Sequence, residues 1–150
     1  MATTTKAVAD ILDRWDIGYY ADSQENFLHL GVKSPNVGTR IILLGAIQNG
    51  LVVNINAPMI FKLNNKVFKA VFLEKLLELQ NSLVLTNFYL NTHSNGEEWV
   101  GASIDLPLFE GELTYQSLFS CMTHLTNHLK EIVPRFRHIL ATGNELDSDR

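Results

Sequence analysis

Two asparagine–glycine pairs, Asn49–Gly50 and Asn95–Gly96, constrain the fold of this chain more than any other feature. Such a pair between apolar segments favours a tight hairpin, because asparagine and glycine accept the positive φ angles that the turn requires. The flanking segments have the apolar patterns of strands. They are residues 39–48 and 51–56 around the first pair, and 84–91 and 99–106 around the second. The sequence therefore predicts two β-hairpins within an antiparallel sheet.

The rest of the sheet is less regular. Residues 26–32 predict a fifth strand, and Ser34–Pro35–Asn36 predicts the turn after it, because proline presets φ and asparagine tolerates tight geometry. Pro58 and Pro107 are expected to end regular strand pairing, since proline has no amide hydrogen to donate to the ladder.

Three segments have the apolar spacing of amphipathic helices. The first covers residues 7–15, and a threonine hydroxyl from positions 3–5 can cap it. The second follows a cap at Asn64 or Asn65, and the third begins at Thr114. The buried stripe predicted for the second helix consists of Val67, Phe68, Val71, Phe72, Leu76 and Leu79.

The element order predicted is α-β-β-β-α-β-β-α. This order indicates an α+β fold with a mainly antiparallel five-stranded sheet, one face covered by helices and the other partly open. Pro134 is expected to kink or break the last helix, because it removes one amide and crowds the preceding turn. Residues 1–143 are interpreted as a single domain and residues 144–150 as a loose polar tail.

Composition narrows the class of protein. The chain is 46% hydrophobic and 19% charged, which provides a core and argues against disorder. The longest apolar runs, such as residues 41–47, are too short to span a membrane, and the first residues do not resemble a secretory leader. The single cysteine, Cys121, and the formal charge of −4 favour a cytoplasmic protein whose main partner is not nucleic acid.

The second half of the chain carries a resemblance to a known family. Its features are Asn87–Asn91, the Asn95–Gly96 turn, the strand that ends in Asp105–Pro107, and Leu113–Thr114 before a long helix. In element order over residues 3–140, the chain resembles the YbjN-like proteins, described as bacterial sensory transduction regulators, which share their fold with type III secretion chaperones. The resemblance implies a small, acidic, cytoplasmic, dimeric protein that handles other proteins and has no known catalytic residues.

No enzymatic constellation is complete. His124 and His128 have the four-residue spacing of helical zinc ligands, and Cys121 lies one turn earlier. The glutamate of the hydrolase motif is missing, His124 is expected nearer to solvent, and no fourth ligand is placed by sequence. The acidic pairs Glu97–Glu98 and Glu110/Glu112 lie beside turns and are expected to be solvated. We therefore expect no metal, no cofactor and no catalysis.

Charge is divided along the chain. No acidic residue occurs from Asn26 to Leu73, and no lysine or arginine from Leu76 to Leu129. The two segments can neutralise each other across the sheet, or the acidic one can face a basic partner or a second copy. Three lysines, Lys62, Lys66 and Lys69, are a weak footprint for phosphate or nucleic acid.

Tyr89 and Trp99 lie on paired strands. They are either half-buried core residues or lie together on the face that helices leave open, where they would form an apolar patch suited to another protein. Together with Glu97 and Glu98, they are the predicted protein-binding residues, beside a strand edge to which an extended segment could add. The main hypothesis is a non-enzymatic, cytoplasmic protein-binding or regulatory domain acting as a homodimer.

The alternative is a small-molecule or signal-sensing domain. It requires an enclosed pocket between the last helix and the sheet, near Phe88, Ile104 and Met122. A metal-dependent enzyme is the third and weakest hypothesis.

Overall fold

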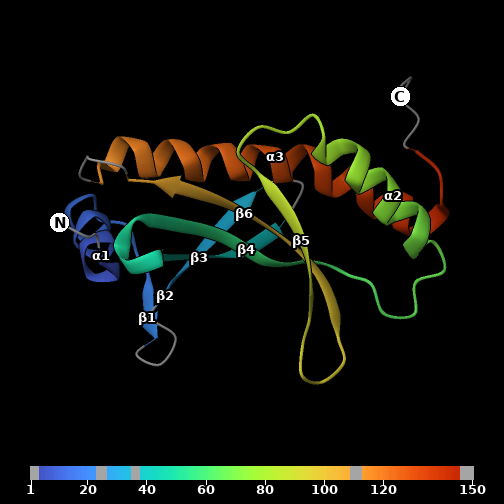
Figure 1. The fold of residues 1–150 in the computed structure, drawn as a ribbon, viewed down its shortest axis with the longest axis horizontal. Coiled ribbons are helices and arrows are strands. Elements are labelled where there is room, and N and C mark those ends of the chain that lie inside the picture. Colours follow the sequence, from blue (N-terminus) through green and yellow to red (C-terminus); the bar gives the residue numbers. More distant parts are fainter. Residues whose placement is uncertain (1–3, 23–26, 35–37, 109–112, 146–150) are drawn as a thin grey trace.

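The computed structural model describes residues 4–22, 27–34, 38–108 and 113–145. It has the predicted α+β fold, with three α-helices and one fully antiparallel sheet (Figure 1). The elements are α1 (Thr5–Arg14), β1 (Tyr20–Asp22), β2 (Phe27–Ser34), β3 (Gly38–Ile47), η1 (Gln48–Gly50), β4 (Val52–Lys62), α2 (Lys69–Gln80), β5 (Asn87–Thr92), β6 (Glu98–Pro107) and α3 (Tyr115–Thr142).

The sheet has six strands, in the order β1-β2-β3-β4-β6-β5, rather than the five expected. The additional strand is β1, which pairs with β2 through only three residues, Tyr20 to Asp22. Three residues are too few to show the alternation by which a strand is recognised. This strand lies in the stretch before residue 26 that carried no clear pattern.

Both predicted hairpins are confirmed. The β3–β4 hairpin pairs Ile47 with Val52 around a short 3-10 turn, in which Gly50 has φ 82°. The β5–β6 hairpin closes through a hydrogen bond from the His93 amide to the Glu97 carbonyl (2.8 Å), and Gly96 has φ 87°. The glycines thus take the left-handed conformations that made the sequence signal strong.

The two outer helices begin where their caps predict. The hydroxyl of Thr4 accepts from the Ala7 amide (3.1 Å) at the start of α1, and that of Thr114 accepts from the Ser117 amide (3.2 Å) at the start of α3. Each bond satisfies an amide that has no partner inside its helix.

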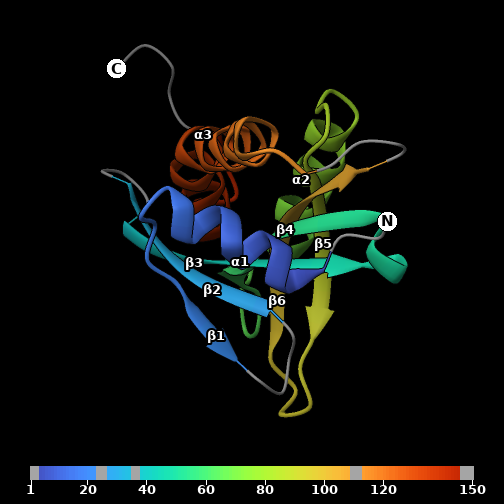
Figure 2. The ribbon, with the colours of Figure 1, turned by 90° about the vertical axis from the view of Figure 1, so that its left-hand side faces the viewer.

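All three helices cover one face of the sheet (Figure 2). α1 packs on β2 and β3, α3 packs on β4 and β6, and α2 packs against α3 and β5. The strand registers place the buried apolar residues of every long strand on this face, since directly paired residues point to the same side. The buried strand residues that share it are Leu28, Leu30, Ile42, Leu44, Val53, Ile55, Ala57, Val100, Ala102 and Ile104.

Three phenylalanines join β4, α2 and α3 at the centre of the core. The ring of Phe72 meets Phe61 edge-on with centroids 5.0 Å apart, and meets Phe136 edge-on at 5.6 Å. Edge-to-face pairs at these distances are stabilising beyond the area that they bury.

Regular pairing ends at Pro58, as predicted, although the strand itself continues. β4 continues to Lys62, and its pairing with β6 is interrupted after Ala57 and resumes at Phe61. On the other side, β3 has already stopped pairing with β4 at Asn56. The missing amide hydrogen of proline is tolerated at such an irregular position.

Of the kink or break expected at Pro134, the break is wrong, because α3 runs through this residue to Thr142. An interior proline costs roughly 3 kcal/mol. The turns around it bury Ile132, Val133 and Phe136, and burial of one such side chain contributes roughly 1.5–3 kcal/mol. The core contacts of the second half of α3 therefore offset the local penalty.

The second helix begins later than predicted. Its first residue is Lys69, and Val67, expected in the buried stripe, precedes the helix and is 88% exposed. Asn64 caps no helix: its side chain donates to the Gly96 carbonyl (3.0 Å) and accepts from the Glu98 amide (2.7 Å). The asparagine is used instead to fasten the β5–β6 hairpin.

Several predicted features lie outside the described residues. These are most of the turn at Pro35 and Asn36, the acids Glu110 and Glu112, and residues 146–150 of the polar tail. The described beginning of that tail is held in place. Glu145 accepts two hydrogen bonds from Arg135, at 2.7 and 2.8 Å.

We predict that Phe136→Ala lowers the free energy of unfolding by about 3–5 kcal/mol, because it empties the centre of the core. Chemical denaturation measures this change. The control is Val67→Ala, at a side chain that is 88% exposed. It should cost less than about 1 kcal/mol. Equal losses for the two variants would contradict the assigned core.

Candidate functional site

β5 is an edge strand, and its outward backbone groups can be assigned from the pairing. The His93–Glu97 closing bond makes residues 93, 91 and 89 the ones that exchange hydrogen bonds with β6. Residues 88, 90 and 92 therefore direct their amides and carbonyls away from the sheet. Gln80 of α2 accepts from the Phe88 amide (2.8 Å), which confirms this direction. The amide and carbonyl of Leu90 face the open edge.

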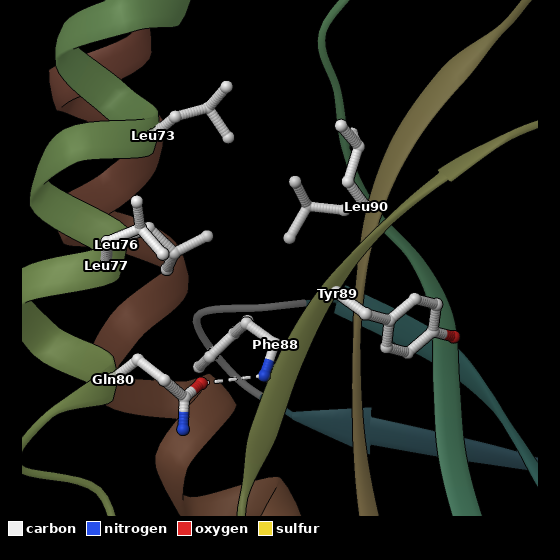
Figure 3. A pocket seen from close by; sticks show the side chains of 8 residues that line it. Leu73, Leu76, Leu77, Gln80, Phe88, Tyr89 and Leu90 are labelled. Atoms are coloured by element: carbon white, nitrogen blue, oxygen red, sulfur yellow. Dashed lines mark hydrogen bonds between the residues drawn. The ribbon is translucent and has the colours of Figure 1, made fainter.

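A cleft of about 180 Å³ lies between this edge and α2 (Figure 3). Leu73 and Leu77 project into it from α2, and Leu90 faces them from β5, whereas the ring of Tyr89 points away. Leu77 is 70% exposed and Leu90 is 51% exposed. The lining is almost wholly apolar and consists of Leu73, Leu76, Leu77, Gln80, Phe88, Tyr89, Leu90 and Val100.

The helix that forms one side of the cleft carries two acids, Glu74 and Glu78, which do not line the cleft itself. Glu74 and Glu78 follow the cleft leucines on α2, and neither makes a salt bridge within the described part of the chain. Lys75, between them, pairs with Glu145 at 3.7 Å instead. The chain from Asn81 to Thr92 carries no charged residue that could neutralise them.

Tyr89 and Trp99 lie on the open face of the sheet, the second of the two placements predicted. The strand register places both beside Gly101 on the side opposite the helices. The Tyr89 ring lies on Gly101, and its hydroxyl donates to Oδ1 of Asn56. Burial raises the pKa of the Tyr89 hydroxyl, which therefore stays protonated as a donor. The Trp99 indole donates to Glu97 (2.9 Å).

The surroundings of these two rings differ from the apolar patch that we expected. The open face of β4, β6 and β5 is dominated by amides and hydroxyls. Its polar residues are Asn54, Asn56, Asn87, Asn91, Ser103 and Asp105. Asn54 donates to Asp105 (2.7 Å) across two of these strands. The apolar surface next to β5 lies instead in the cleft on the helix side.

Glu97 and Glu98 are engaged within the protein. Glu98 accepts from the Lys69 ammonium at 2.8 and 2.9 Å, and Glu97 lies 3.6 Å from that of Lys62. The indole hydrogen bond and the nearby Lys62 ammonium lower the pKa of Glu97. Both pairs join a lysine from residues 26–73, which contain no acid, to a glutamate from residues 76–129, which contain no lysine or arginine. At this hairpin the two segments therefore neutralise each other, and no free acidic face is left. As a partly exposed pair, Lys69–Glu98 contributes at most about 1 kcal/mol.

His124 and His128 contact the segment between α2 and β5. Nε2 of His124 donates to the Val84 carbonyl (2.9 Å), so this imidazole is bonded to the chain while it remains partly exposed. Nδ1 of His128 lies 2.9 Å from the hydroxyl of Thr86, which is 1% exposed. No group of three or more metal-ligating side chains occurs in the described ranges.

Residues 83–86, which we call the strap, were predicted to begin a strand at Val84. Leu85 has φ 74°, and the Thr86 amide donates to the Val84 carbonyl (2.9 Å), a γ-turn that ends any extended conformation. The sequence analysis also missed Gln80 and the α2 side of the cleft. Leu77 is exposed, whereas the other leucines of this helix are buried or half-buried, a difference that the sequence alone does not reveal.

The fold is similar to that of a solved structure. YbjN from E. coli, described as a candidate transcription regulator, superposes with a TM-score of 0.63 over 99% of both chains, at 12% sequence identity. This likeness supports a YbjN-like fold. No family model matches the chain, and no curated protein matches its sequence. Among the described residues, no helix is long and apolar enough to cross a membrane.

We predict that Gly101→Ala destabilises the protein by about 1–3 kcal/mol, the usual cost of overpacking. A Cβ there would lie 2.5 Å from the Tyr89 ring and 3.0 Å from the Ala57 carbonyl oxygen. In a Tyr89→Ala background the ring is gone, so the same substitution should cost less. A double-mutant cycle by thermal denaturation tests this coupling. Strict additivity would show that the ring does not rest on Gly101.

Proposed function

We infer that this chain is a non-enzymatic protein-binding domain that takes up an extended polypeptide segment at the β5 edge. The observation that carries the inference is the combination of unpaired edge groups at Leu90 with an apolar cleft beside them. Main-chain hydrogen bonds provide affinity in strand addition, and pockets for alternate side chains provide specificity. The segment should alternate apolar and other residues, and the acids Glu74 and Glu78 favour a basic one.

The size of the cleft favours this function over small-molecule sensing. Sites for drug-sized ligands measure roughly 300–1,000 Å³. A cleft of about 180 Å³ is suited to one or two side chains of a bound segment. It also lies between α2 and β5, not between α3 and the sheet near Met122, where the sensing alternative required it. Phe88 is the residue common to both locations.

The regulatory part of the proposal is supported by the fold. YbjN, the structural neighbour, is described as a candidate transcription regulator, and a domain that captures another protein's segment suits a regulatory role. A cytoplasmic location and a homodimer belong to the same proposal. A surface available for the dimer is the stacked row of Trp15, Tyr115 and Phe119, with centroids 4.1 and 5.4 Å apart. Trp15 is 58% exposed.

Selection of displayed random peptides on the pure protein tests the binding function. We expect enrichment of extended sequences with alternating apolar residues and a lysine or arginine. Leu90→Pro should abolish their binding, because it removes the outward amide while the β5–β6 ladder keeps all its donors. Leu90→Ala keeps that amide and loses only the side chain, so it should weaken binding by less.

Val67→Ala, at an exposed residue outside the cleft, is the control and should bind as the original protein does. Circular dichroism establishes that each variant is folded. Two outcomes contradict the proposal: no peptide is enriched, or the enriched peptides bind Leu90→Pro as tightly as the unaltered chain.

Light scattering tests the dimer separately. We expect twice the chain mass for the original protein and a shift towards the monomer for Phe119→Ser, because the substitution removes an exposed ring of the stacked row. A monomer at all concentrations would remove the homodimer from the proposal and leave peptide binding untouched.

A further inference from the structure

The strap is held in a strained conformation. Leu85 has φ 74°, in the left-handed region that leucine rarely occupies, and it is 55% exposed, so its own side chain contributes little packing. Such a conformation persists only where surrounding contacts impose it. The contacts that hold the strap therefore decide how β5 begins.

Three side chains from two helices supply these contacts. His124 binds the Val84 carbonyl, His128 binds the Thr86 hydroxyl, and Nε2 of Gln80 donates to the Thr86 carbonyl (2.9 Å). The other end of the Gln80 amide accepts from the Phe88 amide. Gln80 thus couples the strap to the first outward donor of the β5 edge.

The two imidazoles lie against each other, with ring centroids 4.2 Å apart. The Val84 carbonyl can only accept, so Nε2 of His124 carries a hydrogen. With neutral His128, the buried Thr86 hydroxyl can donate to Nδ1. Protonated His128 has hydrogens on both nitrogens, so the hydroxyl must accept and turn its own hydrogen towards another partner. Two imidazolium rings at this distance also repel each other.

The charged groups around His128 are few. On α3, Glu131 favours its protonation and His124 opposes it, while Cys121 is a thiol whose pKa is raised by burial. The strap and β5 carry no charge. On α2, the Lys75 ammonium pairs with Glu145. The carboxylate of Glu145 and, more weakly, that of Glu78 raise the pKa of Arg135. The faces of β4 and β6 beneath α3 are apolar.

We propose that His124 and His128 form a proton-sensitive latch, which holds the strap at neutral pH and releases it when His128 is protonated. Release lets the strap leave its strained turn and frees Gln80 from Thr86 and Phe88. The Phe88 amide then joins that of Leu90 as an open donor beside the cleft. Acidification thereby lengthens the edge available to an extended segment, a consequence that rests on the proposed binding function.

The direction of the pH dependence follows from the environment of His128. Burial, followed by the neighbouring His124, lowers its pKa below the ordinary value. The neutral form is therefore the one favoured while the strap is latched. The latch has its full strength above the ordinary histidine pKa of about 6.5, and it is lost as the pH falls below that value and through the lower pKa of His128 in the folded protein.

Amide hydrogen exchange on the protein alone tests the latch without any partner. The amides of Thr86 and Phe88 are followed by NMR at about pH 7.5 and about pH 5.5, on either side of the histidine pKa of about 6.5. After correction for intrinsic exchange rates, we expect their protection to fall at the lower pH, because the neutral form of His128 that holds the strap is depleted there. Amides of the β4–β6 ladder should keep their protection and serve as the internal reference.

His128→Gln should remove this pH dependence, whereas the matched control His138→Gln, elsewhere on α3, should keep it. His124→Gln retains a donor for the Val84 carbonyl and removes the neighbouring imidazole. In this variant the midpoint of the loss of protection, followed at intermediate pH values, should therefore move to higher pH. Unchanged protection of Thr86 and Phe88 in the original protein would overturn the latch, and so would the full fall in a folded His128→Gln. If that variant does not fold, an unmoved midpoint in His124→Gln overturns it. Peptide selection can fail while the latch is present, so the two proposals are tested independently.

Discussion

One-sided burial of the sheet is the constraint on which the rest of this structure depends. Every long strand places its buried apolar residues towards the same side, where α1, α2 and α3 cover them. The other side of β4, β6 and β5 is thereby left to asparagine, serine and aspartate side chains. Since side chains alternate along a strand, a slip of one residue in any register would bury these amides and expose the core.

The same constraint creates the candidate site. β5 is the last strand of the sheet, and α2 covers it only in part, so Phe88 and Leu90 project on the helix side into a space that α2 leaves unfilled. The apolar surface beside β5 is therefore a narrow cleft next to backbone groups. That arrangement explains why the site suits a strand better than a flat interface or a small ligand.

Sequence reasoning predicted the features whose causes are local. The Asn-Gly turns and the caps at Thr4 and Thr114 depend on neighbours within a few residues, and the structure confirms them. It failed where distant contacts decide the outcome. Pro134 remains within a helix because the sheet packs against it, and Asn64 caps no helix because Gly96 and Glu98 bind it first. The strap does not begin a strand, because His124 and His128 hold it in a γ-turn. These histidines follow their hydrogen-bond partners in the strap by 40 and 42 positions.

The candidate site was predicted only in part. The alternation of β5 and β6 allowed the open face for Tyr89 and Trp99 as one of two alternatives, and the register places both there. The edge position of β5 depends on β6 inserting between β4 and β5, and no local pattern encodes that order. The cleft residues of α2 have the same helical periodicity as core residues, so their exposure could be learned only from the packing of the helix.

The strand order has a consequence for synthesis on the ribosome. β4 ends at Lys62 and its neighbour β6 begins at Glu98, so α2 and β5 must be translated before β4 acquires its second partner. Until then, β4 has unpaired backbone groups along one edge and exposes apolar residues such as Val53, Ile55 and Phe61. Such an edge can pair with other nascent chains. Rapid closure of the β5–β6 hairpin by its Asn-Gly turn shortens that interval, since local hairpins form within about 1–10 μs.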